Sequence, residues 1–351
     1  MTELGQHTTL NGRWRVNNKL AQGNSGSAVY VAKDAHLGHT SGWYAVKYPL
    51  KDREHSLITS MYDVRNGQCR CMGIPRIWDI GMHDGRMFMV MDLLGQTMKD
   101  LCKKYRGTLE SKWPAIQVLG RLLVRRLESI HKMNIVHCDV QPRNILMDRS
   151  LVVWPYLCDF GSAVPFPGGE PKRADFGSVD FNSIHSAQGD TRGPWDDLES
   201  LGWVLCNALM GALPWFQDTA TAVWKGGKLD DQQRPLICGR VAKAKAQLLE
   251  KGLDKAAMVQ RFGTEWGHLA TIPFELLDFL RVCSIRAGST MLEQRKVTMG
   301  DYRHLEKVLG GKNANPEAAE HEDVRLFQAL SQDAVLAPPI KGNVKFEWSA
   351  D

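Results

Sequence analysis

Two short motifs constrain this chain more than any other feature of its sequence. Residues 137–144 read H-x-D-x-x-x-x-N, and Asp159-Phe160-Gly161 begins fifteen residues after Asn144. A single loop thus carries an acid that can accept a proton, Asp139, and an amide that can reach a metal ion, Asn144. The hydrophobic stretch between the motifs predicts a short strand pair that returns Asp159 to this loop. Either motif alone could arise by chance, but both in this order predict one shared site.

The two motifs resemble the paired catalytic segments of protein kinases. Phosphoryl transfer needs little covalent help from a protein; it needs a positioned hydroxyl and neutralised phosphate charge. In such a site Asp139 would accept the proton of the substrate hydroxyl, while Asn144 and Asp159 would hold the Mg²⁺ that bridges the phosphates of ATP. The weaker interpretation is that Asp139 and Asn144 only cap a turn.

A glycine-containing turn lies near the start of the chain. Two strand-like segments flank residues 22–27, which include Gly23 and Gly26. Such a turn between strands is suited to folding over phosphates, and we assign both glycines to nucleotide binding. Ala21 stands where related loops have their first glycine, so an ordinary hairpin turn is the alternative.

A lysine follows this turn at the expected distance. Residues 43–47 read W-Y-A-V-K and match the V-A-I-K strand, whose lysine binds phosphates. Alternation along the strand points Lys47 inward, under the turn, and we assign Ala45 to the nucleotide pocket with it. The alternative is a solvated surface charge, which is usual for an isolated lysine at a strand end.

The acid that should pair with Lys47 is missing from its usual place. Residues 52–66 contain one glutamate, Glu54, and matching Tyr62 to the tyrosine of related kinases puts Ile58 at the position of the acid. Glu54 lies one helical turn before Ile58 on the same face, so it could substitute if the helix shifts. The sequence leaves both outcomes open.

A link between two lobes is expected after residue 91. Residues 87–91 form a continuous apolar run, typical of a buried strand, and residues 92–95 would lead out of it. Backbone groups of such a link are natural partners for the edge of adenine, and we assign Met91 and Leu94 to this pocket. An ordinary strand-to-loop connection is the alternative.

Strands dominate the first ninety or so residues, and helices dominate the remainder. The expected fold is therefore α+β and bilobal, with a small, mainly antiparallel β N-lobe over about 12–92 and a larger α-helical C-lobe over about 96–309. Residues 1–11 and 310–351 would be tails, and composition does not decide whether the second folds back or stays disordered. Helical spacing predicts helices over 113–132, 197–210, 239–255, 274–286 and 302–309.

Composition suggests where such a protein would work. The chain has 351 residues and a formal net charge of +5, a mild excess that is compatible with an anionic nucleotide. No stretch approaches the ~18 apolar residues of a membrane span, and the N-terminus lacks an apolar signal core. The cysteines are scattered; only Cys69 and Cys71 are close, without the histidine or second pair of a zinc site. We therefore expect an intracellular protein, cytoplasmic, nuclear or both.

Segments outside the catalytic loop carry a closer resemblance. They read M-G-I-P at 72–75, V-M-D-L-L-G at 90–95, S-I-H at 183–185, D-D-L-E-S-L-G-W at 196–203, G-A-L-P-W at 211–215 and D-Y at 301–302. These segments resemble the casein kinase 1 superfamily, which includes the vaccinia-related kinases. The likeness covers about residues 12–309.

The resemblance implies a kinase that uses ATP and Mg²⁺ to phosphorylate Ser and Thr of protein substrates. It further implies a monomer with no membrane and no direct nucleic-acid partner. The loop residues keep the roles given above, while Lys47 binds phosphates and Met91 guards the back of the adenine pocket. Asp197 would anchor the backbone of the catalytic loop from below.

Several positions depart from the family pattern. Gln141 replaces a lysine that neutralises the transferred phosphate, and charge at such a place typically supplies several kcal/mol of transition-state stabilisation. Gln141 can still donate a hydrogen bond, so we keep it in the catalytic set. Asp180 replaces an arginine linked to acidic substrates, which puts that preference in question. A basic patch could come instead from Lys172, Arg173, Lys225 and Lys228.

Three functions fit these residues. An active Ser/Thr protein kinase explains why Lys47, Asp139, Asn144 and Asp159 are all present. A pseudokinase, an interaction module that can bind nucleotide without transferring phosphate, would explain Gln141, Ile58 and Ala21. A small-molecule phosphotransferase shares the loop motif but not the segments at 183–185 and 196–215.

One regulatory expectation follows from the segment after Asp159. Its first hydroxyls are Ser162 and Ser178, and the loop arginine that would pair with a phosphate is replaced by Cys138. We therefore expect activity that does not require phosphorylation of this segment.

Overall fold

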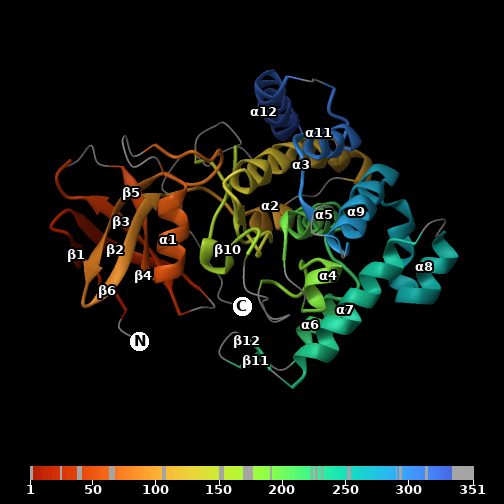
Figure 1. Ribbon diagram of the computed structural model, residues 1–351, viewed down its shortest axis with the longest axis horizontal. Helices are drawn as coiled ribbons and strands as arrows, with labels where there is room; N and C mark the ends of the chain where they lie inside the picture. The colour runs from red at the N-terminus through yellow and green to blue at the C-terminus, as the bar shows by residue number, and fades with distance from the viewer. Residues whose placement is uncertain are drawn as a thin grey trace.

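The structure is a computed structural model of the chain. It describes residues 3–23, 26–37, 42–62, 68–104, 108–149, 154–168, 177–189, 192–222, 224–225, 228–230, 232–250, 254–289, 291, 295–312 and 315–333. Figure 1 shows a β-rich lobe at one end and a larger helical lobe at the other. The α+β, bilobal architecture expected from the sequence is confirmed.

The first lobe is built on a six-stranded antiparallel sheet with the order β1-β2-β3-β4-β6-β5. Its strands are β1 Thr9–Leu10, β2 Trp14–Gln22, β3 Ala28–Asp34, β4 Trp43–Leu50, β5 Ile77–His83 and β6 Arg86–Asp92. Alternate side chains, including Trp14, Tyr30, Val46 and Phe88, are buried in one cluster. Helix α1, Asp52–Ser60, begins directly after β4, so the strand with Lys47 leads straight into the helix with Glu54.

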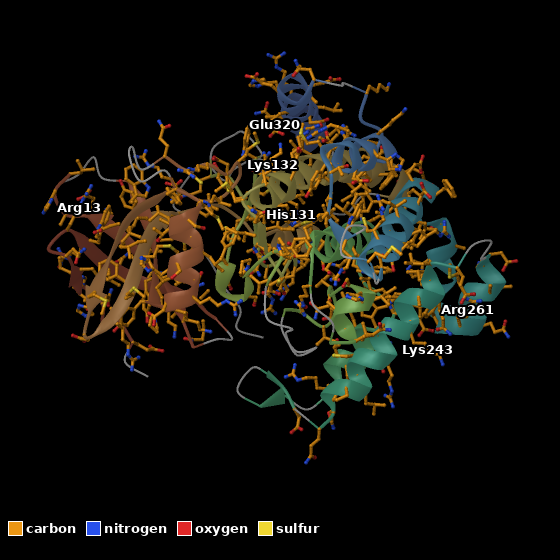
Figure 2. The ribbon with its side chains drawn as sticks, viewed as in Figure 1. Arg13, His131, Lys132, Lys243, Arg261 and Glu320 are labelled. Carbon is orange, nitrogen blue, oxygen red and sulfur yellow. The ribbon has the colours of Figure 1, made fainter. Side chains whose placement is uncertain are left out.

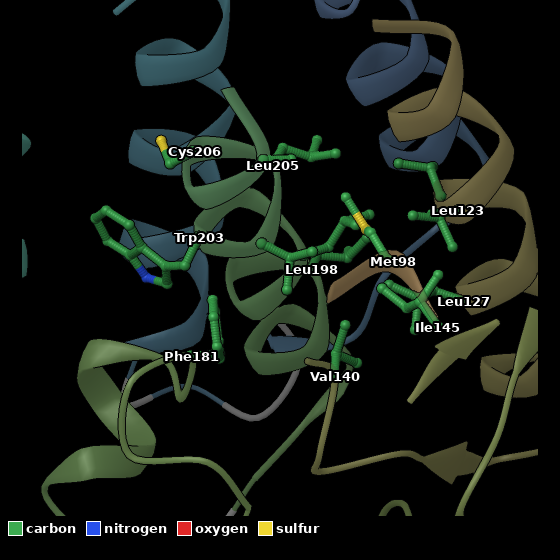
Figure 3. Close-up of a cluster of buried hydrophobic side chains, with 14 of the residues drawn as sticks. Met98, Leu123, Leu127, Val140, Ile145, Phe181, Leu198, Trp203, Leu205 and Cys206 are labelled. Atoms are coloured by element: carbon green, nitrogen blue, oxygen red, sulfur yellow. The ribbon is translucent and has the colours of Figure 1, made fainter. Parts of the chain in front are cut away.

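Helices α3 and α5 form the centre of the second lobe. Helix α3 is capped by the Thr108 hydroxyl, which accepts a hydrogen bond from the Ser111 amide, and its apolar positions face α5 in Figure 3. The helices of this lobe are α2 Met98–Lys104, α3 Leu109–His131, α4 Ile184–Ala187, α5 Pro194–Met210, α6 Phe216–Ala220, α7 Arg234–Leu248, α8 Lys255–Phe262, α9 Phe274–Ala287, α11 Met299–Val308 and α12 Pro316–Asp333, with 3₁₀ turns η2 Phe160–Ser162 and η3 Thr264–Thr271.

Close packing between α5 and α9 depends on one glycine. A Cβ atom at Gly202 would lie 2.4 Å from Cδ2 of Leu280, far inside van der Waals contact. The two helices therefore approach more closely than any residue with a side chain would allow. This packing holds α5 rigid beneath the catalytic loop.

Short strands carry the two sequence motifs. They are β7 Ile135–Val136, β8 Ile145–Met147, β9 Pro155–Leu157 and β10 Val164–Pro165; a further hairpin has β11 Trp224–Lys225 and β12 Lys228–Leu229. Strands β8 and β9 pair antiparallel, with Ile145 opposite Leu157. The expected strand pair between Asn144 and Asp159 is thereby confirmed over the residues that the structure describes.

Most helix predictions agree with the structure to within a few residues, but one was wrong. The helix expected over 239–255 corresponds to α7, which begins earlier, at Arg234, and already ends at Leu248; a new cap begins α8 at Lys255. There the carboxylate of Asp254 accepts a hydrogen bond from the Ala257 amide at 2.8 Å. None of the described helices combines the length and apolar character that a membrane crossing requires.

Part of the C-terminal region folds back onto the second lobe. Helix α12 lies along α3, beside α11, as Figures 1 and 2 show. The buried guanidinium of Arg125 lies 2.6 Å from Glu306 of α11, and 3.0 Å and 2.7 Å from Glu320 and Asp323 of α12. Phe327 of α12 is buried in the core of the lobe. The sequence left open whether this tail folds back or stays disordered. Residues 316–333 fold back, and residues 334–351 lie outside the described part of the chain.

Candidate active site

Lys47, Glu54 and Asp159 meet between the two lobes. The Lys47 ammonium lies 2.6 Å from Oε1 of Glu54 and 2.7 Å from Oδ1 of Asp159. Lys47 is only 5% exposed, so the alternative of a solvated surface lysine is wrong. The sheet, α1 and the β9 strand end each contribute one of these three charges.

The structure settles the open question about the acid on α1. Ile58 is buried among apolar side chains such as Met61 and Met89, whereas Glu54 pairs with Lys47. Of the two outcomes that the sequence left open, the structure therefore shows the second, in which Glu54 takes the place of the acid. Because α1 begins at Asp52, immediately after β4, its first turn is the part that lies beside Lys47.

Electrostatics keep the pair of Lys47 and Asp159 charged. Burial alone would lower the pKa of Lys47, but the carboxylates of Asp159 and Glu54 raise it above its usual value. Burial alone would raise the pKa of Asp159, but the Lys47 ammonium and the Gly161 amide hold it below its usual value. The side chain of Asp159 is still 45% exposed, so this carboxylate also faces open space.

Gly161 lies close beside these charged groups, and only its distance to Asp159 would be tight for a residue with a side chain. A Cβ atom there would lie 3.1 Å from Oδ1 of Asp159, 3.6 Å from Oε2 of Glu54 and 3.9 Å from the Lys47 nitrogen. Asp159 itself has a φ of 64°, a left-handed conformation that non-glycine residues rarely adopt. Backbone strain of this kind is typical of functional sites and persists only where the surroundings enforce it.

Both oxygens of the Asp139 carboxylate accept hydrogen bonds from side-chain amides. Gln141 donates to Oδ1 at 2.9 Å, and Asn144 donates to Oδ2 at 2.8 Å. Burial raises the pKa of Asp139, although the nearby His137 opposes the change. The loop thus holds the Asp139 carboxylate in one orientation as a proton acceptor, and the hydrogen bond from Gln141 helps to fix that orientation.

Asp197 of α5 fixes the backbone of this loop. Its carboxylate accepts hydrogen bonds from the amides of His137 at 2.6 Å and Cys138 at 2.9 Å. His131 of α3 lies 3.0 Å from the same carboxylate and 2.7 Å from the hydroxyl of Tyr302. The anchoring role expected of Asp197 is confirmed, while His131 was missed because no local motif marks it.

Two more contacts hold the loop, and the sequence analysis missed both. Arg192 donates to the carbonyl of Cys138 at 2.6 Å. The ring of His137 lies 3.1 Å from the carbonyl of Cys158 and stacks at a tilt on Phe160, so the two motifs touch directly. The only sequence signal for the second contact was the histidine of the H-x-D motif.

The residues assigned to adenine lie on adjoining strands. Ala45 of β4 is directly opposite Met91 of β6, and Leu94 is buried just beyond that strand. The Gly95 amide donates to the Met147 carbonyl at 2.7 Å, which ties the link between the lobes to the strand that follows Asn144. The structure therefore gathers Ala45, Met91 and Leu94 at the junction of the lobes.

The glycine turn lies next to Lys47 in the sheet. The Gly23 amide donates to the Ser27 carbonyl at 2.7 Å, and the next strand places Val29 opposite Lys47. Gly26 has a φ of 85°, which favours glycine at this position. The tip of the turn, residues 24–25, lies outside the described part of the chain.

The donor set fits a nucleotide with Mg²⁺. Mg²⁺ prefers carboxylate and amide oxygens and usually keeps several waters or phosphate ligands. Asp159 and Asn144 supply such oxygens, and Lys47 supplies a fixed positive charge for phosphate. Among the described residues no cluster of three or more His, Cys, Asp or Glu could hold a metal ion.

The position where a phosphate-pairing arginine would stand in the catalytic loop is occupied by Cys138. Cys138 is buried in a small apolar cluster with Val136, Val164 and Phe166. Asp180 accepts a hydrogen bond from the Thr219 hydroxyl at 2.8 Å. Outside the described residues lie Lys172 and Arg173, as do the side chains of Lys225 and Lys228.

Comparisons with known proteins agree with this geometry. The protein kinase domain family matches residues 14–262. A probable casein kinase I homolog of Encephalitozoon cuniculi is 29% identical over 158 residues, which cover 43% of this chain and 48% of that protein. The match thus spans about half the length of this relative.

The family match covers more than half of the chain and includes Lys47, Asp139, Asn144 and Asp159. The similarity to a casein kinase I homolog agrees with the segments that suggested this superfamily. The chain therefore belongs to the protein kinase family, as a divergent member that resembles casein kinase 1.

Proposed function

We propose that residues 12–309 form an active protein kinase that transfers the γ-phosphoryl group of ATP to Ser and Thr hydroxyls of protein substrates. The observation that carries this proposal is the meeting of Lys47, Glu54 and Asp159 within hydrogen-bonding distance. Kinases need the lysine–glutamate pair and the metal-binding aspartate in place at the same time. A chain that no longer handled phosphate would have no packing reason to bury Lys47 between two acids.

Each residue then has a defined task. Lys47 holds the phosphates, Glu54 orients Lys47, and Asp159 and Asn144 hold Mg²⁺. When bound, ATP would supply the phosphoryl group, and Mg²⁺ would offset the negative charge of the phosphates. Asp139 accepts the proton of the substrate hydroxyl, and its raised pKa brings it closer to the working pH of a general base.

Gln141 has a different task from the lysine that it replaces. Its amide fixes Asp139 at 2.9 Å but brings no positive charge to the transferred phosphate. The expected consequence is a working but slow enzyme, because charge at this place stabilises the transition state. This same observation favours the second candidate function, a pseudokinase that binds nucleotide without efficient transfer.

The resemblance also supports proposals about the setting. We propose a monomer that acts in the cytoplasm, the nucleus or both, on protein substrates and without membrane or nucleic-acid partners. The scattered cysteines, which have no paired spacing, support an intracellular setting.

Nucleotide binding would not separate the two functions, but transfer would. Casein incubated with labelled Mg-ATP should carry label on phosphoserine or phosphothreonine after hydrolysis, and chelation of Mg²⁺ should abolish it. Label on phosphotyrosine alone would contradict the proposed specificity. ATP binding without any label would favour the pseudokinase.

Activity should survive removal of phosphate from the protein. The position that would pair with a phosphorylated segment is the buried thiol of Cys138, and the catalytic loop is held by Asp197 and Arg192 instead. Phosphatase treatment should therefore leave the transfer rate nearly unchanged. A treated protein that stays folded but loses activity would show that a phosphate is required.

A further inference from the structure

Cys69 and Cys71 lie in the segment between α1 and β5, which contacts helix α3 of the second lobe. Position 69 forms a β-bridge with Tyr62 just beyond α1, and the Arg70 amide donates to the Met61 carbonyl at 2.8 Å. On the other side, the Cys71 thiol lies 3.7 Å from the Ser129 carbonyl of α3. The two cysteines thus sit where the helix with Glu54 is tied to the helical lobe.

The Cys69 sulfur lies against the backbone of Cys71, two residues along the chain. It accepts a hydrogen bond from the Cys71 amide at 3.3 Å, and its thiol can donate to the Cys71 carbonyl, also at 3.3 Å. Hydrogen bonds to a sulfur stabilise its thiolate, and Cys69 is half-buried, whereas Cys71 is buried.

The surroundings separate the reactivity of Cys69 from that of the other cysteines. Hydrogen bonds from Cys71 lower the pKa of Cys69 to about 7, against the effect of burial. The pKa of Cys71 is raised by its hydrogen bond to Cys69 and by burial. Burial raises the pKa of Cys102 to about 11 and also raises the pKa values of Cys158, Cys206 and Cys283. A thiolate at neutral pH beside a second thiol is the arrangement of a redox-sensitive cysteine.

We propose that Cys69 and Cys71 form a peroxide-responsive thiol pair, in which Cys69 is oxidised and Cys71 closes a disulfide. The Cys69 thiolate attacks one oxygen of a hydroperoxide; the S–O bond forms, the O–O bond breaks, and the leaving alkoxide or hydroxide takes up a proton. The Cys71 sulfur then attacks the resulting sulfenic acid. The S–S bond forms, the S–O bond breaks, and hydroxide leaves as water with the proton from Cys71. The two thiols together supply the two electrons that reduce the peroxide.

The disulfide would affect the active site through α1. Oxidation draws the Cys71 sulfur toward Cys69 and away from the Ser129 carbonyl, and it removes the hydrogen bonds at Cys69. Because position 69 is bridged to Tyr62 just beyond α1, we expect this change to shift α1, which carries Glu54, the partner of Lys47. This consequence rests on the proposed function. We expect a reversible loss of the transfer rate of about two- to thirtyfold, the usual effect of changes at residues that connect two sites in a protein.

The chemical step is tested on the full-length reduced protein with hydrogen peroxide and intact-mass measurement. Wild type should lose about 2 Da as two hydrogens leave, with Cys69 and Cys71 alone becoming protected from alkylation. The reaction rate should rise with pH through about 7, following the Cys69 thiolate. Cys71→Ser should instead accumulate a sulfenic acid on Cys69 that dimedone traps.

Two further variants decide whether Cys69 is the reactive thiol. Cys69→Ser should not form the disulfide, while Cys102→Ser, a change at another partly buried cysteine, should react like wild type. Faster oxidation at other cysteines, or unchanged peroxide consumption by Cys69→Ser, would overturn the proposal. Unchanged transfer after the disulfide has formed would overturn its regulatory part.

Phosphate transfer by the oxidised protein is measured independently of its intact mass. Reductant should restore transfer in the oxidised wild type, and Cys69→Ser should keep its transfer rate in peroxide. A protein that forms the disulfide but shows no transfer even when reduced would contradict the proposed kinase function, not the thiol chemistry.

Discussion

Replacing Asp139 with asparagine is expected to lower the rate constant for phosphate transfer by roughly 10²- to 10⁴-fold, the usual contribution of a positioned general base. Asparagine keeps the size of the side chain but cannot accept the proton. It also meets the amides of Gln141 and Asn144 with only one oxygen, where Asp139 offers two. ATP affinity should change little, because Lys47 and Asp159 hold the nucleotide in this account.

The matched control is Asp100→Asn on α2, where the carboxylate accepts a hydrogen bond from Thr97 and lies outside the site. This variant should transfer phosphate at the wild-type rate. Equal activity of Asp139→Asn and wild type would mean that the base has been assigned wrongly. Wild type should also lose transfer as pH falls, with a midpoint above that of an exposed aspartate, because burial raises the pKa of Asp139.

Replacing Arg125 with methionine is expected to lower the free energy of unfolding by about 3–5 kcal/mol, the range for breaking one side of a buried ion pair. Arg125 forms ion pairs with three acids, which come from helices α11 and α12: Glu306, Glu320 and Asp323. Without it, the three buried carboxylates lose the one partner that they share, and among the described residues each keeps a single other arginine: Arg121 at Asp323, Arg126 at Glu320 and Arg303 at Glu306. Urea unfolding followed by circular dichroism measures the loss.

The control for this change is Arg240→Met. Arg240 lies 3.6 Å from Asp218, and its side chain is 56% exposed. An exposed pair of this kind contributes less than about 1 kcal/mol. Similar losses in the two variants would show that α12 separates from α3 easily, and that the buried network does little to hold the tail.

The sequence predicted well which residues lie together in the candidate site, because these residues follow local spacing rules. Asp139 and Asn144 share one loop, and a strand pair returns Asp159 to it, so distance along the chain translates into distance in space. Lys47 followed from strand alternation, which depends on the two-residue repeat of a strand. These contacts needed no knowledge of how distant parts of the chain pack.

The errors came where tertiary packing decides. Counting back from Tyr62 put Ile58 at the position of the acid, but the start of α1 directly after β4 brings Glu54 to Lys47 instead. The Arg192 contact to Cys138 and the folding back of α12 onto α3 join residues far apart in sequence. Neither has a local pattern, so composition and periodicity could not reveal them.

Transfer of labelled γ-phosphate from Mg-ATP to casein and to the protein itself, measured over time beside Asp159→Asn, tests the central claim most directly. Asp159→Asn removes one carboxylate oxygen from the metal position and weakens the contact with Lys47. The account predicts steady incorporation by wild type and its loss in the variant. A folded wild type that binds ATP yet leaves casein, itself and a broad panel of Ser and Thr peptides unlabelled would contradict it.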